Sequence, residues 1–133
     1  MRGARFLGDR QAEVTDFPDV EPGSHEVLIK VRASGMCGSD LHTYRASSSE
    51  VNTEHRPGHE PCGEVVALGP GVTSARIGDR AMIHHYLGCG ICRFCREGYH
   101  QLCSQPGPYT KYYGGSAHGG HGEHMVVHES TLV

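Results

Sequence analysis

The chain has 133 residues and a net charge of −3, and 20% of its residues are charged. This balance disfavours nucleic acid or an acidic membrane surface as a partner. Aromatic residues make up 7% of the chain and tryptophan is absent, which also weakens the case for base stacking. The length suits one domain, and 19 glycines with 7 prolines indicate many turns and short strands.

The first third of the sequence predicts three short strands. Residues 2–7 and 11–16 are expected to form a hairpin whose turn lies at residues 8–10. In residues 26–33, apolar side chains such as Val27 alternate with polar ones, which is the period of a half-buried strand.

The middle of the chain alternates between loops and strands. Residues 38–45 are expected to form one or two helical turns, and the polar residues 46–57 an irregular loop. Further strands are predicted at 63–68 and 80–84, with a Gly-Pro-Gly turn at 69–71 between them.

The last third begins with a cysteine-rich loop at about 88–104 and a connection rich in glycine, tyrosine and histidine that runs to about residue 121. A final strand is predicted at 123–127. The fold class that follows is mainly β, with short helices only, and a partly open β-barrel fits these short strands better than a flat sheet.

Two glycine-flanked segments carry a thiol, an imidazole and a carboxylate. The first reads Cys-Gly-Ser-Asp-Leu-His over 37–42, and the second reads Gly-His-Glu over 58–60. Cys37, His59 and Glu60 are ligand types that suit zinc, and a catalytic zinc site uses about three protein ligands and leaves one position open. These residues are therefore candidates for a catalytic metal site.

The neighbours of Cys37 strengthen this hypothesis. Ser39 and His42 bring a hydroxyl and an imidazole together, as a proton relay from a buried metal requires. Asp40 could hold a ligand imidazole in its metal-binding tautomer. Singly, Cys37 as a small buried side chain and His59 as a core histidine would need no metal, but the combination favours a metal site.

Four further cysteines form the pattern C-x2-C-x2-C-x7-C, at Cys89, Cys92, Cys95 and Cys103. Four thiolates with short spacers can surround one ion in a tetrahedron, and such sites are closed and structural. The segment at about 88–104 is therefore predicted to be a structural zinc lobe.

The alternatives to a zinc site in this lobe are an iron–sulfur cluster and two disulfides. In the ferredoxin pattern the fourth cysteine follows after three residues and precedes proline, whereas Cys103 follows after seven and precedes Ser104. Two disulfides would need an oxidising compartment, and residues 1–10 contain no apolar run typical of a secretory signal. We therefore expect a cytoplasmic protein with free thiols. We also expect no membrane span, because no run of the sequence approaches the roughly 18 apolar residues that a span requires.

The remaining cysteine and histidines have no ligand-like spacing. Cys62 is expected to be a packing residue. Most other histidines, among them His25, His55, His118 and His128, are expected at the surface.

A dinucleotide-binding domain is not recognisable in the sequence. No Gly-x-Gly-x-x-Gly lies between a strand and a helix, and the glycines of 119–122 have neither the spacing nor the flanks of that motif.

Taken together and in this order, the motifs resemble the catalytic domain of the zinc-dependent medium-chain alcohol and polyol dehydrogenases. The resemblance is carried by five segments: 37–42, 58–63, 78–80, the four-cysteine lobe, and 119–123, which is similar to the family's Gly-Gly-x-Ala-Glu. It covers nearly the whole chain and implies a GroES-like, partly open β-barrel over residues 1–133, as the N-terminal part of a longer dehydrogenase.

The resemblance also implies roles for the candidate residues. Cys37 and His59 would bind catalytic zinc, with Glu60 as a neighbouring or exchangeable ligand. Ser39 would receive the alcohol proton and His42 would pass it towards solvent, while Asp40 would support a ligand such as His59. The lobe cysteines would hold structural zinc.

Family members oxidise alcohols or reduce carbonyls with NAD or NADP. Zinc lowers the pKa of the bound alcohol, so that an alkoxide forms and hydride leaves to the nicotinamide. The expected partners are thus a small alcohol or carbonyl substrate and zinc, with no nucleic acid and no membrane. A homo-oligomer is compatible with the resemblance, but the motifs do not decide it.

Two departures from the family limit what the 133 residues are expected to do. The remaining catalytic-zinc ligand, a Cys or Glu, and the nicotinamide-binding Rossmann domain are both absent. The chain is therefore expected to carry structural zinc, to hold catalytic zinc weakly and to transfer no hydride by itself. A non-enzymatic zinc-binding module and a GroES-like structural domain are the alternative functions.

Overall fold

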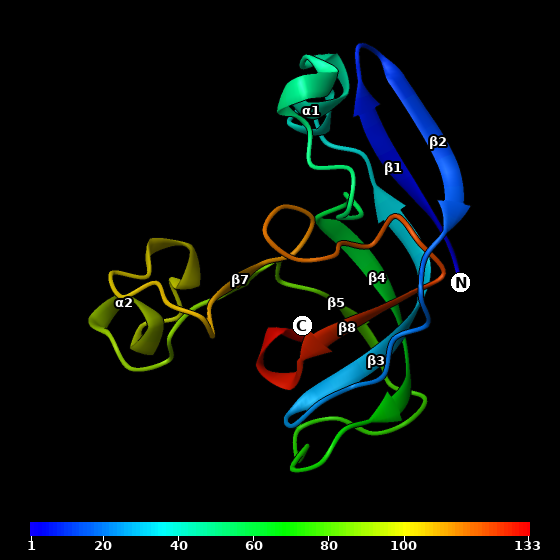
Figure 1. The fold of residues 1–133 in the computed structure, drawn as a ribbon. Coiled ribbons are helices and arrows are strands. Elements are labelled where there is room, and N and C mark those ends of the chain that lie inside the picture. The colour runs from blue at the N-terminus through cyan, green and yellow to red at the C-terminus, as the bar shows by residue number, and fades with distance from the viewer.

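The computed structural model describes all residues from 1 to 133, and it shows a body of short strands from which one lobe projects (Figure 1). The strands form three separate sheets, with strand orders β1-β2, β5-β4-β3-β8 and β6-β7. The sheets do not close into a complete barrel, so the architecture is mainly β and open.

The N-terminal hairpin consists of β1 (Arg2–Gly8) and β2 (Gln11–Asp16), paired antiparallel as predicted. Its turn places Asp9 and Arg10 at positive φ, 48° and 63°, which is the backbone twist that two-residue hairpin turns favour. An isolated bridge between Gly3 and Gly122 ties the hairpin to the body.

The four-stranded sheet forms the centre of the body. It contains β3 (Glu26–Gly35), β4 (Glu60–Leu68), β5 (Arg80–Met82) and β8 (His124–His128). The predicted strands are present, but β4 begins three residues earlier than expected and β5 ends two residues earlier. Both differences lie at strand ends, where tertiary pairing rather than local pattern decides the boundary.

The core lies on one face of this sheet. Its fully buried members are Val27 and Ile29 from β3, Val65 from β4, and Met125 and Val127 from β8. These positions alternate along their strands, so the period-two pattern of the sequence marks the inner face correctly.

The helices are short and lie outside the sheet. They are α1 (Asp40–Arg45), α2 (Arg93–Arg96) and three 3-10 turns at Ser48–Glu50, His100–Leu102 and Glu129–Thr131. None of them has the length and hydropathy that a membrane crossing requires.

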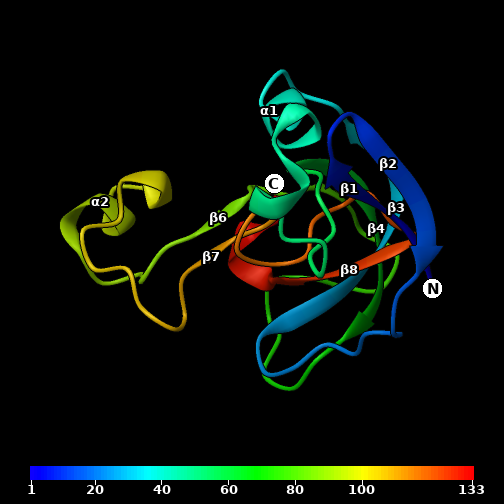
Figure 2. The same cartoon turned by 45° about the horizontal axis from the view of Figure 1, so that its top comes forward.

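A short ladder of β6 (Tyr86–Leu87) and β7 (Lys111–Tyr112) joins the lobe to the body, and we call it the neck. Both views of the ribbon show the lobe with α2 standing away from the sheets (Figure 2). This ladder was not predicted from the sequence, because each strand has only two residues, too few to show a period.

Candidate metal sites

The first candidate site lies where β3 and β4 meet. The end of β3 pairs with the start of β4, so that Gly35 lies opposite Glu60 and Ser34 opposite Pro61. Cys37 follows β3 by two residues, and His59 immediately precedes β4. Strand register therefore brings together two segments that are about twenty residues apart in the chain.

Glycine shapes the backbone beside His59. Gly58 has a φ of +99°, and a Cβ atom there would lie 2.6 Å from Nδ1 of His121. A side chain at this position would be strained and would displace the 119–122 segment. The glycine before His59 is thus needed for the turn that presents the imidazole.

The three predicted ligands converge. One ligand atom from each of Cys37, His59 and Glu60 lies within 4.8 Å of the others. The side chain of His59 is only 10% exposed, whereas Glu60 is exposed. A soft sulfur, an imidazole nitrogen and a carboxylate oxygen at this spacing fit a zinc ion, with room for an exogenous ligand.

Asp40 contacts two of these three residues, Cys37 and His59. Its Oδ2 accepts a hydrogen bond from the backbone N–H of Cys37 at 2.7 Å, and its Oδ1 lies 3.5 Å from Nδ1 of His59. Because the carboxylate faces Nδ1, the other nitrogen, Nε2, is left for a metal. Asp40 therefore lies where it can hold the imidazole of His59 in its metal-binding tautomer.

Ser39 lies close to the cluster, and its Oγ is 3.4 Å from Nε2 of His59. The backbone amide of Ser39, then its hydroxyl, and then His59 lower the pKa of Cys37, which favours the thiolate that a metal binds. His42 is exposed on α1, and no side-chain hydrogen bond joins it to Ser39.

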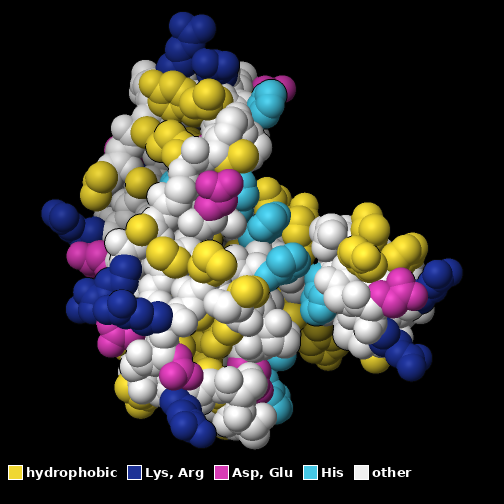
Figure 3. All heavy atoms as spheres, turned by 180° about the vertical axis from the view of Figure 1, so that it is seen from behind, with side chains coloured by type: hydrophobic (Ala, Val, Ile, Leu, Met, Phe, Trp, Pro, Cys, Tyr) yellow, Lys and Arg dark blue, Asp and Glu magenta, His cyan; other side chains and the backbone are white.

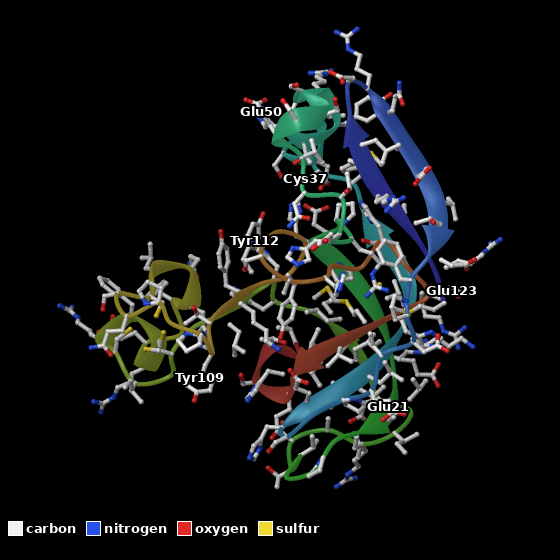
Figure 4. All side chains as sticks on the ribbon, in the orientation of Figure 1. Glu21, Cys37, Glu50, Tyr109, Tyr112 and Glu123 are labelled. Atoms are coloured by element: carbon white, nitrogen blue, oxygen red, sulfur yellow. The ribbon has the colours of Figure 1, made fainter.

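The second candidate site is the interior of the lobe. The sulfur atoms of Cys89, Cys92, Cys95 and Cys103 all lie within 4.8 Å of one another, and no disulfide joins any cysteine of the chain. Figure 4 shows these sulfur atoms gathered inside the lobe.

Backbone amides point at the lobe sulfurs. The N–H of Cys89 donates to the sulfur of Cys103 at 3.4 Å, that of Cys92 to Cys89 at 3.4 Å, and that of Cys95 to Cys92 at 3.5 Å. Amides of Cys95 and Ser104 lower the pKa of Cys92, whereas burial raises the pKa of Cys95. Four sulfurs this close accumulate negative charge as they ionise, and a divalent cation would balance it. The donor set fits zinc.

A group of aromatic rings that was not predicted from the sequence lies beside His59. The ring centroid of His85 lies 5.4 Å from that of His59, 4.5 Å from Tyr86 and 5.6 Å from Tyr112. Tyr86 and Tyr112 face each other across the neck, with centroids 5.0 Å apart and planes 13° from parallel. No spacing in the sequence indicates this group, because only the pairing of β6 with β7 assembles it.

His85, Tyr86 and Tyr112 are all partly buried. Seen from behind, histidine side chains gather where the lobe joins the body (Figure 3). Burial is the largest of the effects that raise the pKa of Tyr112, so its phenol stays protonated. Burial first, and then the nearby His59, lower the pKa of His85, which favours the neutral imidazole.

The other residues without ligand-like spacing lie elsewhere. Cys62 is partly buried on β4 and belongs to neither cluster. His25 and His118 are exposed, while His55 and His128 are partly buried. The expectation that these histidines lie at the surface therefore holds for His25 and His118. It holds only in part for His55 and His128.

The alcohol dehydrogenase GroES-like domain family matches residues 23–133 of this chain. An uncharacterised zinc-type alcohol dehydrogenase-like protein from Escherichia coli, YphC, is 35% identical over all of this chain and 39% of its own length. L-threonine 3-dehydrogenase of Pyrococcus horikoshii is 38% identical over 87% of this chain and 33% of its own length.

Among solved structures, a thermostable alcohol dehydrogenase from Pyrobaculum aerophilum superposes on the whole chain with a TM-score of 0.86 and 33% identity, and 40% of its own length is covered. The predicted GroES-like architecture is confirmed by these similarities. The chain spans less than half the length of the relatives and structures that it matches.

Proposed function

Because this chain belongs to the alcohol dehydrogenase GroES-like domain family, we propose that it is the catalytic domain of a zinc-dependent, NAD- or NADP-linked alcohol or polyol dehydrogenase. The observation that carries this proposal is the convergence of Cys37, His59 and Glu60 within 4.8 Å. A structural domain or a simple zinc module would have no need of a second, three-ligand cluster outside the lobe.

In this proposal Cys37, His59 and Glu60 hold the catalytic zinc. When bound, the ion supplies Lewis-acid chemistry to the oxygen of an alcohol or carbonyl. Asp40 keeps the imidazole of His59 in the tautomer that leaves Nε2 free to bind, and its hydrogen bond to the amide of Cys37 fixes the neighbouring backbone.

Proton movement is assigned to Ser39 and His42. The Ser39 hydroxyl lies beside Nε2 of His59 and would take up the proton of the substrate alcohol. The helix α1 begins directly after Ser39, and His42 is exposed on it. Once its side chain turns towards the Ser39 hydroxyl, His42 would release the proton to solvent.

The four lobe cysteines would hold a structural zinc. Their free thiols fit a reducing compartment, and we therefore place the protein in the cytoplasm. A similar alcohol dehydrogenase has been solved with cobalt and zinc bound, which also supports the assignment of zinc to this chain.

The nicotinamide cofactor is assigned to a part of the polypeptide outside these residues. Similar dehydrogenases have been solved with NADH or with NADP, and this chain covers 37% of each. Residues 1–133 would then be the catalytic domain of a longer dehydrogenase, with a small alcohol or carbonyl as its substrate.

Metal analysis and turnover together test this function. The chain should bind two zinc ions before rinsing with chelator and keep one, at the lobe, after rinsing. Cys37→Ala should remove only the weaker ion, and in the complete polypeptide it should abolish alcohol oxidation. If turnover survived in Cys37→Ala, the assignment of the catalytic site would be wrong.

A further inference from the structure

A cleft lies between the lobe and the body, beside the start of β3 and the end of β8. It has a volume of about 610 Å³, and residues of both parts line it. The lobe contributes Cys89 and Cys95, two of the four predicted ligands, and the body contributes His25, Glu26 and His128. The four-cysteine site therefore borders this cleft, although Cys95 is only 6% exposed.

Two other hollows lie against the lobe. The one beside α2 is lined by Arg93, Arg96 and Glu97 and includes no cysteine. The other, a cavity of about 190 Å³ beside the neck, includes Cys103 and no other cysteine. Neither hollow reaches as many predicted ligands as the cleft does.

Three imidazoles line the cleft, those of His25, His100 and His128. Nδ1 of His100 accepts a hydrogen bond from the backbone N–H of Gly88 at 3.1 Å. Nδ1 of His128 accepts one from the backbone N–H of Ser130 at 3.2 Å. Each of these two rings, when neutral, therefore carries its proton on Nε2 and has no free lone pair for a metal.

His25 has the opposite tautomer. Its Nδ1 lies 2.9 Å from Oε1 of Glu129, and His25 first, then Ser74 and Thr73, lower the pKa of this carboxyl group to about 2. Because the ionised carboxylate can only accept, Nδ1 of His25 carries the proton and Nε2 keeps a free lone pair. A carboxylate that accepts from the second ring nitrogen is the usual support of a metal-binding histidine.

The cleft is accessible to a cation at this imidazole. The side chain of His25 is 53% exposed. Lys111 also lines the cleft, but its Nζ lies 2.6 Å from Oε1 of Glu26, which neutralises its charge. The carboxylate of Glu129 adds negative charge beside the ring. Geometry, tautomer and charge thus all favour binding of a divalent metal ion at His25.

We propose that this cleft is the route by which divalent transition metals exchange at the four-cysteine site, and that His25 binds the incoming ion first. A four-cysteine site is closed, so an incoming ion needs a ligand close by until a thiolate becomes free. The bond to Nε2 of His25 then breaks as a thiolate of Cys89 or Cys95 bonds to the ion, and no electron is transferred. This inference goes beyond the proposed function, but it rests on metal binding by the lobe.

The test measures metal exchange at the loaded lobe of Cys37→Ala, in which the lobe is the only complete cluster of predicted ligands. The lobe is loaded with cobalt, and excess zinc replaces it while the thiolate-to-cobalt absorption decays. His25→Asn removes the imidazole, and asparagine tolerates the positive φ of 58° at this position. Exchange should become about three- to tenfold slower. The affinity for cobalt should not change, because a residue that only relays the ion slows uptake and release equally.

Each variant has a matched control. His55→Asn should leave the rate unchanged, because His55 lies outside the cleft, where its ring contacts that of His118. Ser24→Trp places a large side chain in the cleft and should also slow exchange. Arg93→Trp adds the same bulk beside α2, away from the cleft, and should have no effect.

Three results would contradict these expectations. Unchanged exchange in both His25→Asn and Ser24→Trp, or equal slowing in Arg93→Trp, would overturn the inference. A lower cobalt affinity in His25→Asn would also overturn it, since the substitution would then act on the lobe site itself. If no thiolate-to-cobalt absorption formed at all, the structural metal site of the proposed function would be wrong, and the route with it.

Discussion

One carboxylate oxygen of Asp40 lies 3.5 Å from Nδ1 of His59, and the two side chains are only 6% and 10% exposed. The other oxygen accepts the backbone N–H of Cys37. A single residue at the start of α1 thus contacts both segments of the candidate site. Asp40 is the residue through which the position of Cys37 is coupled to that of His59.

Asp40→Asn should therefore weaken zinc binding at the first site. Loss of a carboxylate that hydrogen-bonds a metal-binding imidazole typically lowers metal affinity by about 10- to 100-fold. Competition between the chain and a chromophoric chelator measures this, and the lobe zinc should be unaffected. Asp16→Asn, an exposed change on β2, is the control. Equal affinities for both variants would show that Asp40 has no role in orienting the ligand.

Cys103→Ser should remove the lobe zinc. Three thiolates remain, but a closed four-ligand site loses its geometry, and the metal contributes directly to the folding of such a lobe. Elemental analysis should find one zinc ion fewer per chain, and hydrogen exchange should show lost protection confined to the lobe and neck. Cys62→Ser serves as the control and should keep the full zinc content, because Cys62 belongs to neither cluster.

Glu129→Gln should change how stability depends on pH. The carboxylate of Glu129 contacts Nδ1 of His25 at 2.9 Å and accepts hydrogen bonds from the amides of Thr73 and Ser74, both 2.8 Å, and from the Ser74 hydroxyl at 2.7 Å. These contacts, with His25 first, lower the pKa of Glu129 from 4.5 to about 2.

Since the folded pKa is the lower one, the ionised carboxylate stabilises the folded chain. Its contribution is complete above about pH 4.5 and is lost as the pH falls towards about 2. Glu129→Gln should therefore lower the thermal midpoint at pH 7 by several degrees, and the difference from the native chain should shrink as the pH falls from 5 to 2. A difference that stayed constant with pH would contradict this, and Glu21→Gln at an exposed position is the control.

Gly63→Ala should destabilise the central sheet. A Cβ atom at Gly63 would overlap the backbone oxygen of Lys30 and lie 2.6 Å from Cγ2 of Ile29, and neither can move without disturbing β3. We expect a loss of about 1–3 kcal/mol in a denaturant titration. Gly38→Ala is the matched control, because no atom lies within 4 Å of a Cβ atom there. If the two variants were equally stable, the close approach of β3 and β4 would not be a constraint.

Much of the fold could be predicted because local pattern and tertiary packing agree. The alternation around Val27 and Ile29 marks both a strand and its buried face, and the Gly8–Arg10 turn marks the hairpin. The two-residue strands of the neck could not be predicted, because Tyr86 and Tyr112 are 26 residues apart and pair only when the lobe folds back.

The sequence by itself determined the donor types and their order: a thiol at 37, an imidazole at 59, a carboxylate at 60 and four closely spaced thiols in the lobe. Short spacers limit how far apart the lobe sulfurs can lie. The four-cysteine cluster could therefore be predicted without a structure. Only the tertiary structure decided that Cys37 meets Glu60, since this depends on the register of β3 against β4. It also decided that His85, Tyr86 and Tyr112 stand beside His59, because a contact between distant segments depends on packing and leaves no periodic trace in the sequence.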